Sequence, residues 1–120
     1  MRLASDNARF GAPIARLGFP MAPREAALVL NAVGELTARE MLLSAAVLDA
    51  AEMKQRGFLN QVLAASELDA AVQQCVDRIS AMAPQAARLN KQALRPLTQK
   101  IRAQEAIDLV ATAYRYAPAA

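Results

Sequence analysis

The sequence contains no histidine and no tryptophan, and its 120 residues include a single cysteine, Cys75. These absences exclude a histidine-based catalytic triad, a Cys/His pair and a zinc site with soft ligands. A lone cysteine forms no internal disulfide, so a reducing cytoplasm is the expected compartment. Any side-chain chemistry that this chain carries must therefore depend on carboxylates, and no metal site is expected.

Glycine occurs 4 times and aromatic residues make up 4% of the sequence, whereas alanine occurs 29 times and hydrophobic residues reach 55%. This mixture favours helices and is a poor one for sheets. It excludes a collagen-like chain, a disordered chain and an all-β barrel. At 120 residues the chain has the length of one domain, since compact domains usually need about 100 to 150 residues.

Long apolar runs and clusters of positive charge are also missing. Charged residues make up 21% of the chain and interrupt every apolar stretch, so no segment approaches the roughly 20 apolar residues of a membrane helix. The start of the chain lacks the apolar core of a secretion signal. The net charge is +3, but the 14 basic residues are scattered and lie apart from the few aromatic ones. We therefore expect neither a nucleic-acid partner nor a membrane partner.

Short extended pieces and a loop are predicted before the first long helix. Residues 2–4 and 10–12 look like strands around a polar turn, and the first of them has no evident partner strand. Two prolines and a glycine predict a loop over residues 13–20. Pro23 suits the first position of a helix, which Gly34 is expected to end.

Two capping boxes predict the starts of later helices, because in each a Thr or Asp is followed three residues later by Glu. They are Thr37-Ala-Arg-Glu40 and Asp49-Ala-Ala-Glu52, and Gly57 is placed to close the second helix. Residues 47–48 and 58–63 are predicted to be extended.

Amphipathic helices are predicted from Ser66 onward. The first has an apolar stripe made by Leu68, Val72, Cys75, Ile79 and Met82. Steps of four and three residues put this stripe on one helix face, which must be buried against something. Pro84 begins the next helix and Pro96 interrupts it. A last helix from about Thr98 is predicted to place on one face Ala103, Ile107, Val110 and Tyr114.

Several motifs occur in an order and at spacings that resemble the later half of the crotonase family, the enoyl-CoA hydratases and isomerases. They are FGAP (10–13), LG (17–18), AVG (32–34), AREMLLS (38–44), LDAAEMKQRGFLNQV (48–62), EL (67–68) and APQAARLNKQAL (83–94). The segment from Glu40 to Val62 is the most specific, because a methionine-leucine helix, an LDAAE helix start and a GFLNQV strand follow one another as in that family. The resemblance covers about residues 2–95.

The resemblance implies a fold that is mainly α with short β pieces, the C-terminal portion of the α/β crotonase-like fold. Residues 1–65 would form the end of the crotonase core, and residues 66–120 a C-terminal helical oligomerisation region. The family acts on acyl-CoA thioesters and assembles as trimers or hexamers, so the implied partners are an acyl-CoA substrate and further copies of the chain. Coenzyme A enters as part of the substrate, and no separate cofactor is implied. The family's oxyanion-hole donors lie upstream of the stretch matched by Arg2, so we expect a C-terminal fragment.

The resemblance also implies where the site residues would be. Ile14 stands where hydratases have a catalytic Glu, and an isoleucine side chain transfers no proton. Other branches place an Asp at the level of Ala22. Glu25 is the one carboxylate near this loop, but in the first turn of a helix it also has a purely electrostatic explanation.

Further candidates come from the same comparison. Phe19 and Met21 flank the loop along which the family's acyl chain passes. Lys91 matches a family lysine and, with Arg88 and Arg95, shares a helix face that would suit a CoA phosphate, although a solvated polar face is the favoured explanation. Cys75 belongs to the apolar stripe, which favours packing over reactivity.

Two functions from different classes therefore remain open. In one, the chain supplies one pocket wall and the trimer contacts of an acyl-CoA hydratase or isomerase. In the other, it is a non-catalytic helical interaction module or a catalytically inactive homologue.

Overall fold

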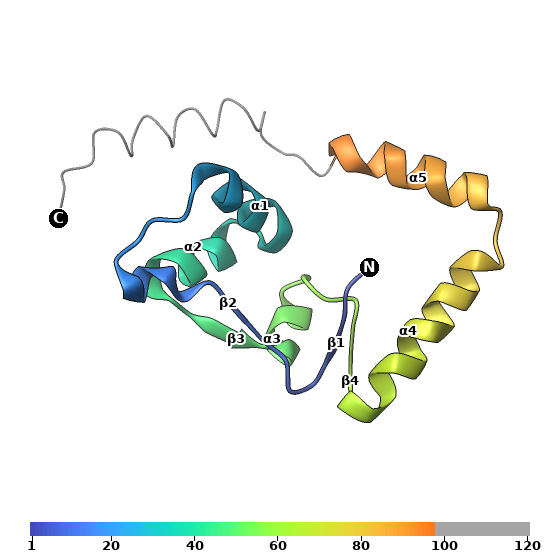
Figure 1. The fold of residues 1–120 in the computed structure, drawn as a ribbon, viewed down its shortest axis with the longest axis horizontal. Helices are drawn as coiled ribbons and strands as arrows, with labels where there is room; N and C mark the ends of the chain where they lie inside the picture. Colours follow the sequence, from blue (N-terminus) through green and yellow to red (C-terminus); the bar gives the residue numbers. More distant parts are fainter. Residues whose placement is uncertain (98–120) are drawn as a thin grey trace.

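The structure, a computed structural model, describes residues 1–97 and is mainly helical with short strands (Figure 1). Its elements are β1 (Leu3–Ser5), β2 (Arg9–Gly11), the 3-10 helix η1 (Pro13–Leu17), α1 (Pro23–Val33), α2 (Glu35–Ser44), β3 (Val47–Asp49), α3 (Ala50–Gln55), β4 (Gln61–Leu63), α4 (Ala65–Ser80) and α5 (Pro84–Leu97). This confirms the predicted fold class and the order of helices. The helix predicted from Thr98 lies outside the described residues.

The four strands form two separate pairs. β1 pairs in parallel with β4, with Leu3 opposite Gln61, and β2 pairs antiparallel with β3, with Phe10 opposite Leu48. The expectation that the first strand has no partner is therefore wrong. Strands of three residues show no clear alternation in sequence, and a parallel partner lies far along the chain because a crossover must connect the two strands.

The boundary between α1 and α2 depends on Gly34, which has a φ of +86° and serves as the last cap of one helix and the first cap of the next. Pro23 begins α1 as predicted. The capping box proposed at Thr37 is wrong, because α2 already begins at Glu35 and the Thr37 side chain is buried inside it. The predicted loop after β2 contains η1.

The second predicted helix start is confirmed. The Glu52 backbone N–H donates a 2.8 Å hydrogen bond to Asp49 Oδ1, so Asp49 caps α3. Gly57 follows with a φ of +87°, a left-handed conformation that costs glycine little. The chain thereby reverses within a few residues and returns to β4.

The core lies among these short elements. Its buried members come from β1, α2, α3 and the turn before β4 and are Ala4, Met41, Ala50, Met53 and Leu59. Phe10 and Phe58 pack at its edge in a T-shaped pair with ring centroids 5.6 Å apart. Arg2 covers the Phe58 ring, with its guanidinium carbon 4.4 Å from the ring centroid.

Helices α4 and α5 extend away from this core (Figure 1). α4 packs against β1, and α5 packs against α4. Neither helix contributes a buried residue. The radius of gyration is 17.5 Å, whereas a compact domain of 100 residues has about 13 Å. The apolar stripe predicted for α4 is therefore left largely uncovered within residues 1–97.

Candidate functional site

Four of the predicted pocket residues, Ile14, Phe19, Met21 and Ala22, lie on the connection between β2 and α1. Ile14 is half-buried in η1, and η1 packs against α2. Gly18 ends η1 in a left-handed conformation, φ +76°, which turns the chain toward α1. The Phe19 side chain follows directly and is 67% exposed. The connection therefore presents hydrocarbon and no proton-transferring group at these four positions.

Glu25 lies in the first turn of α1 and is exposed. A carboxylate in a first turn is stabilised by the partial positive charge of the helix N-terminus. This placement accounts for Glu25 without a catalytic role.

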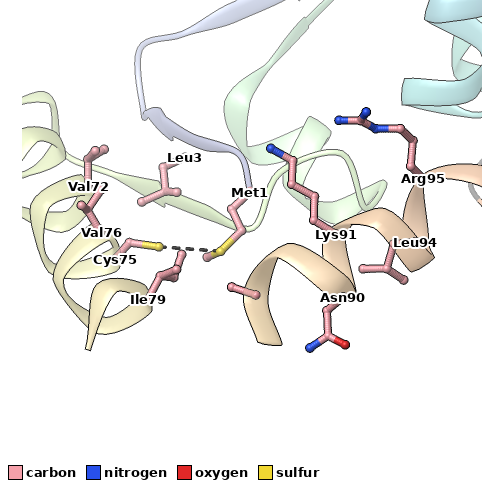
Figure 2. A pocket seen from close by; sticks show the side chains of 11 residues that line it. Met1, Leu3, Val72, Cys75, Val76, Ile79, Asn90, Lys91, Leu94 and Arg95 are labelled. Carbon is pink, nitrogen blue, oxygen red and sulfur yellow. Dashed lines mark hydrogen bonds between the residues drawn. The ribbon is translucent and has the colours of Figure 1, made fainter. Parts of the chain in front are cut away.

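Lys91 lies elsewhere, on an open groove lined by α4, α5 and the start of the chain with Met1 and Leu3 (Figure 2). The groove has a volume of about 800 Å³. Its apolar lining includes Leu3, Val72, Cys75, Val76, Ile79 and Leu94. In Figure 2 the side chains of Lys91 and Arg95 project from the same side of α5, as their spacing predicts, whereas Asn90 points away from them. Arg88 is not among the lining residues.

The structure thus separates the predicted site residues into two places. η1 adjoins α2, and α5 lies at the opposite side of the described chain (Figure 1). Within residues 1–97, Lys91 is not brought beside Ile14. A site that uses both would need them to come from different copies or to bind distant parts of one long ligand.

Cys75 is half-buried within the groove, and its Sγ lies 3.7 Å from Met1 Sδ. Two soft side chains in contact among apolar neighbours are typical of packing. Among the described residues, no three His, Cys, Asp or Glu side chains gather closely enough to hold a metal ion. Within the same residues, no helix has both the length and the hydropathy needed to cross a membrane.

An arginine-centred cluster that sequence reasoning missed joins α2 to the end of α3. Arg56 binds the carboxylates of Glu40 and Glu52 and the hydroxyl of Thr37. The hydrogen bonds that the guanidinium donates to Glu40, and then the one that it donates to Glu52, raise the pKa of Arg56 above its ordinary value. The spacing of Glu52 and Arg56 by four residues was a visible signal for half of this cluster. No sequence signal linked Thr37 or Glu40 to Arg56, because they lie 19 and 16 residues from it in the sequence.

Comparison with known proteins identifies the family of this chain. A family model described as enoyl-CoA hydratase/isomerase matches residues 1–118. The chain belongs to this family.

Crystal structures of the enoyl-CoA hydratase/isomerase family share the fold. An enoyl-CoA hydratase/carnithine racemase from Magnetospirillum magneticum superposes with a TM-score of 0.77 and 31% identity, covering 97% of this chain and 43% of that one. A probable enoyl-CoA hydratase from Mycobacterium smegmatis gives a TM-score of 0.76 at 31% identity, covering 90% of this chain and 44% of that one. The crotonase-like fold is therefore confirmed.

In the curated relatives, the matched region is a smaller share of the relative's own length than in these crystal structures. A short-chain-enoyl-CoA hydratase of Clostridium acetobutylicum is 33% identical over 94 residues, which is 78% of this chain and 36% of that protein. A probable enoyl-CoA hydratase of Mycobacterium bovis is 30% identical over 92 residues, 77% of this chain and 36% of that protein. This chain of the hydratase/isomerase family thus spans about a third of the length of the curated relatives that it matches.

Proposed function

We propose that this chain is the C-terminal part of an acyl-CoA hydratase or isomerase, in which it supplies one wall of the acyl pocket and contacts between copies. The observation that carries the proposal is the extent of the superposition: 97% of this chain corresponds to 43% of a solved family member. The substrate would be an acyl-CoA thioester, with coenzyme A as part of the substrate and no separate cofactor. A reducing cytoplasm suits a chain with one cysteine.

In this proposal Ile14, Phe19, Met21 and Ala22 contribute an apolar wall, and Lys91 binds a CoA phosphate. Because the wall offers no carboxylate, proton transfer and polarisation of the thioester carbonyl would come from residues outside this chain. The chain's own contribution is shape and exclusion of water beside the reacting carbon.

The first test is an assay of the purified 120-residue chain on crotonyl-CoA, followed through loss of the enoyl absorbance. We expect no hydration above the buffer rate, because loss of an acid/base group alone costs on the order of 10² to 10⁴ in rate. Hydration that is abolished by Glu25→Gln would contradict the assignment of catalysis to residues outside this chain. Glu35→Gln is the matched control, since Glu35 is also exposed in the first turn of a helix.

A second assay concerns Ile14 in a longer polypeptide that also has the family's upstream half. With Ile14 the pocket is apolar and has no second group to position water, so we expect hydration to be weak and a one-acid reaction, such as isomerisation or thioester hydrolysis, to be favoured. The Ile14→Glu variant should increase hydration of crotonyl-CoA. Hydration by the unmodified polypeptide that this variant does not improve would show that Ile14 is not the missing partner.

The alternative, a non-catalytic helical interaction module, is supported by the uncovered stripe of α4, where Val72 and Ile79 are 42% and 45% exposed. Apolar surface of this extent favours association of copies. We expect sedimentation at micromolar concentration to show self-association, as trimers or hexamers in the family's manner, and Ile79→Asp to weaken it. Ser80→Asp, on the neighbouring exposed position, is the control. A compact monomer would contradict the contacts between copies that we propose for the enzyme part, and it would also contradict the interaction module.

A further inference from the structure

Helix α2 contributes a buried apolar side chain to the core cluster and also takes part in a polar cluster with Arg56. The apolar side chain is Met41, which is buried in one cluster with Ala50 and Met53. The polar cluster lies on the positions just before it, where Thr37 and Glu40 bind Arg56. Two different contacts on one helix can fix both its distance from the core and its rotation about its own axis.

Arg56 is the centre of the cluster because its guanidinium donates in three directions. Nη1 donates to Thr37 Oγ1 at 3.2 Å and to Glu40 Oε1 at 3.0 Å. Nη2 donates to Glu40 Oε2 at 3.4 Å, and Nε donates to Glu52 Oε1 at 2.8 Å. A planar guanidinium that meets both oxygens of a carboxylate holds it in a defined orientation, which an ammonium group does not. The Arg56 side chain is 26% exposed, so these contacts are partly shielded from water.

The orientation of α2 matters for the candidate pocket. α2 packs against η1, the 3-10 helix with Ile14, and against α1. The last turn of α2 is also held at Glu40, whose carbonyl accepts hydrogen bonds from the Ser44 hydroxyl and the Ala46 N–H. A rotation of α2 would therefore move the surface on which η1 lies.

We propose that Arg56 is a positioning residue: by fixing α2 to α3 it sets the place of η1 and of Ile14. The inference that the position of Ile14 shapes an acyl pocket rests on the proposed function. The positioning itself does not, because it concerns how one segment of this chain is held by another.

Hydrogen exchange followed by mass spectrometry tests this in the full chain without ligand. The reporters are the Gly18 and Phe19 amides, which donate to Ala15 O at 3.2 Å and to Ile14 O at 3.4 Å. The references are the Asp6 and Asn60 amides, which join β1 to the β4 region through Leu63 O at 2.7 Å and Arg2 O at 2.8 Å. These two groups separate a local effect on η1 from a change in global stability.

The Arg56→Met variant keeps an apolar stem and removes the guanidinium. We expect exchange of the η1 amides to become about tenfold faster while the reference amides change less than about twofold. Arg56→Lys should still accelerate η1 exchange about threefold or more, because an ammonium does not reproduce the fork to Glu40. Arg39→Met is the control, since Arg39 forms an exposed ion pair within α2 and contacts no other helix through it.

Equal acceleration of reporter and reference amides would overturn the proposal, because a merely structural role lowers the stability of the whole core. Unchanged η1 exchange, or full rescue by Arg56→Lys, would overturn it too. If Arg56→Met does not fold, Glu40→Gln gives the same readout from the other side of the fork. Absence of acyl-CoA turnover would contradict the proposed function and leave this result unaffected.

Discussion

Residues 3–63 and residues 65–97 are both rich in helix, but only the first region has an interior. All buried residues among the described ones lie between Ala4 and Leu59. Helix α4 has a regular apolar stripe, yet neither α4 nor α5 contributes a buried residue. An apolar stripe at helical spacing predicts a face that requires a partner; it does not predict that the same chain supplies the partner. The division of the chain at residue 65 into a core end and an oligomerisation region remains a prediction.

The largest expected effect is on the core of the first region. Met53 is 0% exposed and contacts members of the core from other elements, so Met53→Ala should lower the free energy of unfolding by about 3 kcal/mol. Ile79→Ala, on a side chain that is 45% exposed, should lower it by less than about 1 kcal/mol. Urea unfolding followed by circular dichroism measures both variants at a concentration where the chain is monomeric. Equal losses would show that α4 is held as firmly as the core.

A smaller loss is expected at the start of α3. Asp49→Ala removes the acceptor of the Glu52 N–H and should lower the free energy of unfolding by about 1 kcal/mol. Asp69→Ala, at an exposed position inside α4, should be nearly neutral. If the two aspartates cost the same, the Asp49 contact would have no energetic value beyond a surface charge.

The capping boxes show how far sequence could predict the first region. Asp49 and Thr37 both have a Glu three residues later, yet only Asp49 caps a helix. Thr37 is preceded by Gly34, whose positive φ lets α2 begin directly after α1, so the pattern at Thr37 falls inside a helix. A local capping pattern therefore predicts that a helix is present. It predicts the first residue of that helix only when no earlier residue can begin the helix.

Contacts between distant residues were beyond sequence reasoning for a different reason. The parallel pairing of β1 with β4 and the binding of Glu40 by Arg56 both depend on how the core packs. The same holds for the candidate site. The apolar character of Ile14, Phe19 and Met21 was evident from the sequence, but the sharing of one helix face by Lys91 and Arg95 did not reveal that this face borders a groove far from Ile14.

A gain of stability is expected where α4 begins. Unlike α3, α4 has no side chain that caps its start, because its first cap is Ala64. The Glu67 N–H already donates to the Ala64 carbonyl at 2.9 Å, so the side chain of Ala64→Asp would serve the Ser66 N–H. We expect this variant to raise helicity and to stabilise α4 by about 0.5 kcal/mol. Far-ultraviolet circular dichroism measures the change, with Ala65→Asp as the control one residue later. No gain in helicity over this control would show that the start of α4 is already fixed by its packing on β1.

The smallest effect is expected for Ala45→Gly, at a position of the first region where the backbone of a non-glycine residue is left-handed. Ala45 is buried and has φ 54°, the one positive φ at a non-glycine residue in the described chain. Ala45→Gly removes a left-handed penalty of roughly 1 to 2 kcal/mol. It also loses the burial of a methyl group, about 0.8 kcal/mol, and adds roughly 0.5 to 1 kcal/mol of backbone entropy cost.

These contributions nearly cancel, so urea unfolding of Ala45→Gly should agree with the unmodified chain to within about 0.5 kcal/mol. At the end of α4, Ala81 has φ −75° and no strain to release, so Ala81→Gly should lose roughly 0.5 to 1 kcal/mol. Ala45→Val sharpens the contrast: a branched side chain in the same left-handed, buried position should cost about 2 kcal/mol. A loss at Ala45→Gly as large as that at Ala81→Gly would mean that the junction after α2 is relaxed, and that the two regions differ in burial alone.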